Sequence, residues 1–134
     1  MSRHGYVDDL DHRDLAMWRG RVASAIRGRR GQKLLVDLRD ALDAMPDKRL
    51  VCGKLQTTDG DVCALGAVGL KRGHDFTNLD PEESNEFLAN TLDVAECLVQ
   101  EIEYENDDFM GNEERRWAYM RKWVESHIKK CEQE

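Results

Sequence analysis

The chain has 134 residues, of which 40% are apolar and 35% are charged, and its formal net charge is −7. This length predicts a single domain that buries about two thirds of the unfolded surface. No apolar run approaches the roughly 18 residues that a membrane span requires, and the N-terminus lacks the apolar core of a signal peptide. We therefore expect a globular protein of the cytoplasm with no membrane partner.

The N-terminal part divides into a polar, irregular segment and a first helix. Residues 1–12 predict a flexible N-terminal arm, and residues 13–131 predict a single globular domain. Residues 13–28 repeat apolar side chains at the spacing of one helix face. That face consists of Leu15, Trp18, Val22 and Ile26.

A second helix is predicted over residues 32–45, where leucines and alanines recur at helical spacing. Pro46 ends it, because the residue before a proline disfavours helical geometry. Gly28 and Gly31 predict a break before it, so that the first two helices form an antiparallel pair. Small side chains also line the first helix and suit a close contact with another helix, either within the chain or in a homodimer. These small residues are Ala16, Gly20 and Ala23.

The middle of the chain contains its least charged run, residues 59–70. A short β-like stretch over residues 49–56 and the turn at Asp59-Gly60 predict a β-hairpin near residues 50–63. Residues 64–72 predict a buried helix that ends at Gly73, with small side chains that let other backbones come close.

Three more helices are predicted in the last third. The first starts with Asp80 as N-cap and runs to about Ala89. The second is capped by Asn90 and precedes an acidic loop over residues 105–108. The third is capped by Asn112 and spans residues 113–130. The fold class is therefore mainly α, a bundle of about five helices with one short hairpin.

Charge is distributed unevenly along the chain. Residues 1–33 contain eight Lys or Arg and four Asp or Glu, a net +4, which leaves −11 for the rest. The basic segment is suited to an acidic protein partner or to nucleic acid phosphates. Alternatively, it pairs with the chain's own acidic side chains at Asp93, Glu96 and Glu103. The candidate partner-binding residues are Arg19, Arg27, Arg29, Arg30 and Lys33.

Other reactive groups point less clearly to a site. Cys63 is predicted near a helix start, which lowers the pKa of a thiol, and His74 is the nearest base in the sequence. The apolar run around Cys63 instead favours an inert core thiol. The acidic stretch 103–108 lacks the spacing of a calcium loop. We predict no catalytic residue, no metal and no cofactor, and a small enzyme or nucleotide-binding module with Cys63 near its site stays an alternative.

The four cysteines lie far apart in the sequence, and no two of them form a C-x-x-C pair. This spacing argues against a structural zinc site. Nothing else in the chain indicates secretion, so we expect free and mostly buried thiols rather than two disulfides. The cysteines are Cys52, Cys63, Cys97 and Cys131.

Several strings resemble a family of small uncharacterised proteins encoded by tailed bacteriophages and prophages. They are residues 18–20, 22–28, 30–32, 41–46, 60–69 and 104–107. The resemblance covers most of the chain and implies action in the cytoplasm of a host bacterium. It implies no reaction, cofactor or catalytic residue. We expect an accessory protein that binds a host, phage or defence macromolecule, with inhibition as one outcome and nucleic-acid binding as the alternative.

Overall fold

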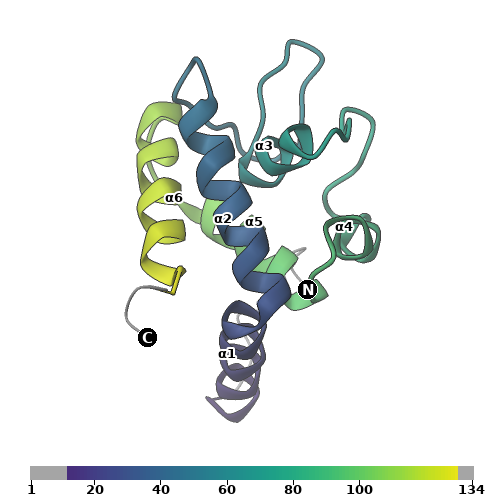
Figure 1. Ribbon diagram of the computed structural model, residues 1–134, viewed down its shortest axis with the longest axis vertical. Helices are drawn as coiled ribbons and strands as arrows, with labels where there is room; N and C mark the ends of the chain where they lie inside the picture. Colours follow the sequence, from purple (N-terminus) through teal and green to yellow (C-terminus); the bar gives the residue numbers. More distant parts are fainter. Residues whose placement is uncertain (1–11, 130–134) are drawn as a thin grey trace.

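The computed structural model describes residues 12–129, and it confirms the mainly helical class. Six helices lie in this part of the chain and pack as one domain (Figure 1). None of these six is long and apolar enough to cross a bilayer. The predicted arm lies outside the described residues except for His12, which begins the first helix. The helices are α1 (His12–Arg27), α2 (Arg29–Ala44), α3 (Ala64–Lys71), α4 (Asn85–Leu92), α5 (Glu96–Asp108) and α6 (Glu113–His127).

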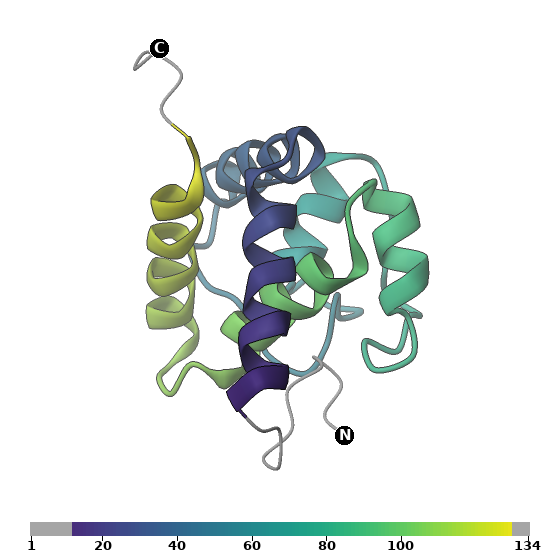
Figure 2. The same cartoon turned by 90° about the horizontal axis from the view of Figure 1, so that it is seen from below.

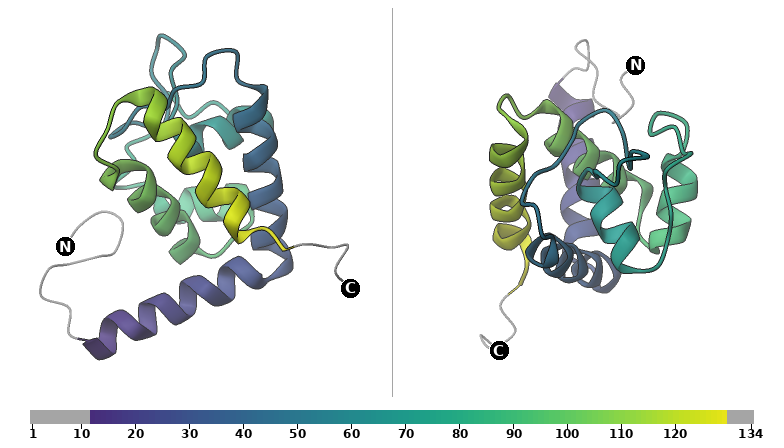
Figure 3. Two further views of the ribbon diagram at one scale, coloured as in Figure 1. Left: turned by 90° about the vertical axis from the view of Figure 1, so that its left-hand side faces the viewer. Right: turned by 90° about the horizontal axis from the view of Figure 1, so that it is seen from above.

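The first two helices are separated by one extended residue, Gly28. The predicted second break at Gly31 is wrong, because Gly31 lies inside α2 and is buried. A Cβ at Gly31 would lie 1.9 Å from the carbonyl oxygen of Ala25, so glycine here permits the close approach of α1 to α2. The two helices cross instead of running antiparallel (Figure 3).

Helix α3 is the buried centre of the fold and contacts both α2 and α5. Every residue from Val62 to Gly69 is buried. A Cβ at Gly66 would lie 1.9 Å from the carbonyl oxygen of Leu55. The small side chains of this helix therefore allow the 50–63 segment to pack directly on it. Helices α4 and α6 lie at opposite sides of the molecule (Figure 2).

The predicted β-hairpin near residues 50–63 is wrong. Within the described residues, this segment forms only an isolated antiparallel bridge between Gln56 and Val62. The left-handed backbone at Gly53, with φ +80°, interrupts the extended run. Backbone groups that a ladder would need are also bound elsewhere, since the Leu50 amide donates to the Glu113 carbonyl at 3.0 Å.

A buried polar pair holds this segment against the helices. The side-chain oxygen of Asn106 accepts from the Ala64 amide at 3.1 Å, and its nitrogen donates to the Val51 carbonyl at 3.0 Å. Arg116 donates to the Asn106 carbonyl at 2.8 Å and to the Leu50 carbonyl at 3.1 Å. Asn106 is 1% exposed and Arg116 is 6% exposed. Leaving such a buried group unpaired costs about 1–3 kcal/mol.

The helix boundaries after residue 80 differ from the prediction. Asp80 caps a single turn, because its side chain accepts from the Glu82 amide at 2.9 Å, and α4 begins only at Asn85. Asn90 lies inside α4 and does not cap a new helix. Asp93 ends α4 in the left-handed region, with φ 59°, a conformation that aspartate tolerates. Residues 105–108, predicted as a loop, form the last turn of α5.

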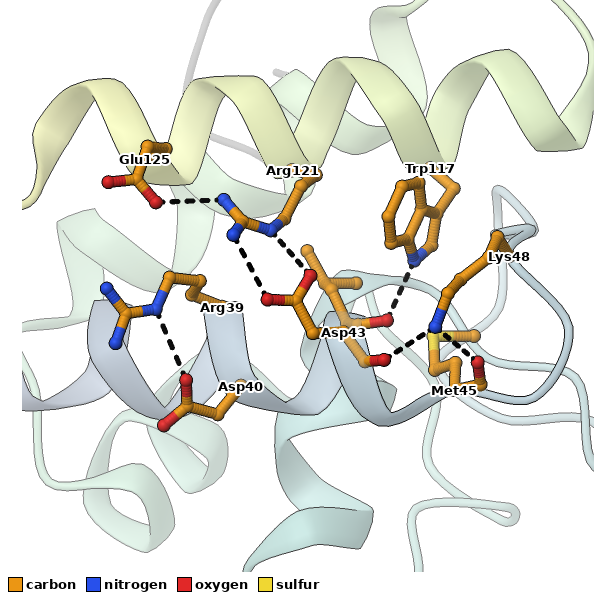
Figure 4. Close-up of polar contacts among 9 residues, drawn as sticks. Arg39, Asp40, Asp43, Met45, Lys48, Trp117, Arg121 and Glu125 are labelled. Carbon is orange, nitrogen blue, oxygen red and sulfur yellow. Dashed lines mark hydrogen bonds and ion pairs between the residues drawn. The ribbon is translucent and has the colours of Figure 1, made fainter.

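Helix α6 begins at the predicted cap and packs along α2. Asn112 accepts from the Arg115 amide at 2.8 Å. Arg121 clamps Asp43 through two nitrogens, at 2.7 and 3.0 Å, and also binds Glu125 (Figure 4). Trp117 donates to the Leu42 carbonyl at 3.1 Å. Both tryptophans of α6, Trp117 and Trp123, are half-buried and pack against the core.

We predict that Gly66→Ala destabilises the fold by about 2–4 kcal/mol, because the added Cβ must displace the Leu55 backbone. Gly20→Ala is the matched control, since a Cβ there meets no atom within 4 Å. The control should stabilise the helix by about 1 kcal/mol. Urea denaturation followed by circular dichroism measures both. Equal stabilities for the two variants would contradict the close approach at Gly66.

We also predict a pH dependence from His127. Burial lowers the pKa of His127 below its ordinary value of 6.5, and its ring lies 4.6 Å from that of Trp123. The folded protein therefore binds fewer protons than the unfolded chain, and the free energy of unfolding falls as pH drops from about 6.5 through the lower folded pKa. His127→Phe should remove this slope.

Asp43→Asn is the control for the histidine effect. The Arg121 hydrogen bond lowers the pKa of Asp43 from 3.8, so the contribution of Asp43 is present above that pH and is lost on further acidification. Urea denaturation between pH 3 and 8 separates the two ranges. An unchanged slope near pH 6 in His127→Phe would refute the role of His127.

Candidate functional site

The predicted basic residues lie on α1 and the first turns of α2, at one end of the molecule (Figure 1). The side chains of Arg19, Arg27, Arg29, Arg30 and Lys33 are all exposed. Among the described side chains of α1, only the apolar residues Val22 and Ile26 are buried. This helix therefore presents most of its circumference outward.

Two of the five predicted residues form ion pairs within the chain. Arg30 binds Asp93 at 3.1 Å, with 58% and 76% of the two side chains exposed. Lys33 lies 4.0 Å from Asp37, which Arg72 binds more closely at 2.7 Å. Exposed pairs of this kind stabilise a fold by about 0–1 kcal/mol, so neither cation contributes much to the stability of the fold.

The other three predicted arginines have no carboxylate partner among residues 12–129. Arg27 donates to the hydroxyl of Ser24 at 3.3 Å, while Arg19 and Arg29 form no ion pair with a described residue. Arg13 likewise forms no ion pair with a described residue. Arg21 lies over the ring of Trp18, 5.4 Å from its centroid. Five arginines have no carboxylate partner among the described residues, four on α1 and one at the start of α2, and they are here called the α1 basic surface. They are Arg13, Arg19, Arg21, Arg27 and Arg29.

Of the three acidic residues predicted to pair with the basic segment, only Asp93 does so among the described residues. Among described residues, Asp93 binds Arg30, and Glu96 forms no ion pair with an arginine of α1. Glu103 is 3% exposed and lies in the interior. Asp93, Glu96 and Glu103 therefore do not form one continuous acidic surface.

A wide, open groove runs beside the α1 basic surface, between α1 and the start of α5. Its volume is about 620 Å³. Met17, at 59% exposure, and Gly20 line it on α1, and Ala95 and Cys97 line it across the gap. Gly20 is one of the small residues that the sequence predicts for a close contact. Ala95 and Cys97 could not be predicted, since only tertiary packing brings them beside α1. The exposed Met17 in an amphipathic helix was the one available signal.

A second hollow of about 380 Å³ lies between the end of α2 and α3. Its lining is mainly aliphatic and includes Val62 and Ala67, and Leu70 at its edge is 46% exposed. Across it, Arg49 binds Asp61 at 3.0 Å. The residues that line it include no cysteine, histidine or serine, so they offer no nucleophile paired with a base.

Cys63 and His74, the other candidate reactive residues, lie at positions where their side chains pack within the fold. Cys63 is the N-cap residue of α3, as expected, but it is 5% exposed and belongs to the core. The ring of His74 stacks on Phe76 at 5.9 Å. The described residues contain no group of three or more His, Cys, Asp or Glu that could hold a metal.

The three described cysteines outside the C-terminal segment are free thiols, as predicted, but they differ in burial. Cys63 is buried, Cys97 is half-buried and Cys52 is exposed, so the prediction of mostly buried thiols is only partly confirmed. Burial raises the pKa of Cys97, and the nearby charge of Arg21 opposes that shift.

Comparison with protein-family models, with curated proteins and with solved structures found no match to the chain. The resemblance to phage proteins therefore stays a prediction. Evidence for a function therefore comes from the geometry of the α1 basic surface and of the groove beside it.

Proposed function

We propose that the chain is a small, non-enzymatic accessory protein of bacteriophage origin. In this proposal it binds an acidic host or defence protein in the bacterial cytoplasm and inhibits it by covering its surface. The observation that carries the proposal is the α1 basic surface, because its arginines are exposed and have no carboxylate partner among residues 12–129. A complementary charge on a partner speeds association and sets specificity.

Nucleic-acid binding through residues 19–33 is the second candidate, because unpaired arginines also suit phosphates. The net charge of −7 opposes nonspecific attraction to a polyanion such as DNA. The enzyme alternative has less support, since Cys63 lies in the core rather than beside a cleft.

We predict that the double variant Arg27→Glu/Arg29→Glu loses its acidic partner. Both side chains flank Gly28 and are exposed, so the substitutions should leave the fold intact. Affinity capture from a bacterial lysate, with quantitative mass spectrometry, should show recovery falling by about tenfold, which corresponds to about 1.4 kcal/mol. The matched control is Arg115→Glu/Lys122→Glu, which changes the charge equally on the exposed face of α6.

Identical recovery with both double variants would contradict the proposal. A gel shift with a DNA duplex at low ionic strength separates the alternative. If the duplex binds and its affinity falls steeply with salt, nucleic acid replaces protein as the partner.

A further inference from the structure

The shape and lining of the groove beside α1 indicate what kind of partner the α1 basic surface can bind. Its α1 side contains a helical row in which Met17, Gly20 and Ser24 follow each other at intervals of three and four residues, with Arg21 and Ala25 beside that row. The same row continues to Arg13 at one end and to Arg27 at the other. The groove is thus mainly apolar, with Arg21 in its lining, and the helical row that forms its α1 side has a cation at each end.

Gly20 has no structural purpose within the described chain. Glycine in a helix interior is less favourable than alanine, and elsewhere in this fold it is explained by a close neighbour, as at Gly31 and Gly66. A Cβ at Gly20 would meet nothing within 4 Å. The missing side chain instead deepens the groove, which lets a second backbone come close to α1.

Two other occupants fit less well. A two-fold contact between copies of the chain, centred on Gly20, would place Arg13 opposite Arg27 of the second copy, and like charges at both ends would oppose it. A small molecule would be poorly enclosed, because the groove is wide and open along its length.

We propose that this groove binds an acidic amphipathic helix of the partner protein, an inference that rests on the proposed function. The apolar side of that helix lies over Met17, Gly20 and Ala95, in the way that helices dock in apolar grooves. Its carboxylates reach Arg13 and Arg27, which are separated by about 21 Å along α1. Arg21 adds a third cation at the edge of the groove.

The test titrates the ¹⁵N-labelled protein with a synthetic helical peptide of about 20 residues. One face of this peptide carries leucines, and glutamates flank that face. A second peptide has the same composition with the leucines scrambled around the helix. We expect the amphipathic peptide to bind at least tenfold more tightly and to shift the amide signals of Met17, Gly20 and Cys97.

Two variants test the groove itself. Gly20→Leu fills it, and Met17→Gln removes its apolar wall, so each should weaken the amphipathic peptide at least tenfold and leave the scrambled peptide unchanged. Ala118→Leu, which places a leucine on the exposed side of α6, is the matched control and should bind normally.

The outcomes separate this inference from the proposed function. Equal binding of both peptides, with no effect of Gly20→Leu, would overturn the groove and leave an acidic partner on the arginines. A shift of the arginine signals by a DNA duplex, with neither peptide bound, would overturn both. A protein that binds none of the three probes would also refute the groove.

Discussion

The side chain of Asn106 holds together three parts of the chain that are far apart in the sequence. It satisfies an amide at the buried start of α3, where a helix has no partner of its own for that group, and it binds the Val51 carbonyl. Arg116 then fixes the backbone of Asn106 and of Leu50. Helices α3, α5 and α6 and the 50–63 segment depend on this pair, because each would otherwise bury an unpaired polar group.

This arrangement closes the interior and leaves recognition to the exterior. The segment from Val62 to Gly69 is buried, so its cysteine and its glycines serve packing. Helix α1 differs, because only Val22 and Ile26 of its described side chains are buried and its arginines are exposed. A rigid core that carries one mostly exposed helix is a suitable platform for binding, and the groove beside Gly20 gives that platform a shape as well as a charge.

The sequence predicted best where one physical rule acted alone. Pro46 ended α2 and Asn112 capped α6 as expected, since both effects are local. The predicted hairpin near residues 50–63 does not form because Gly53 interrupts the extended run and because Asn106 and Arg116, distant in sequence, bind the carbonyls of Val51 and Leu50. Gly31 was predicted to break the helix. It lies inside α2 instead, and a side chain there would collide with the Ala25 carbonyl. Of the site, the exposed arginines were predictable from charge, whereas the pairing of Arg30 with Asp93 and the wall formed by Ala95 and Cys97 required the tertiary structure.

Native-state hydrogen exchange tests most directly whether the Asn106 contact organises the fold around a closed core. The account predicts that the Ala64 amide, bound to the buried Asn106 oxygen, exchanges only by global unfolding, while the central amides of α1 exchange earlier through local opening. An Ala64 amide that exchanges as fast as the amides of α1 would contradict it.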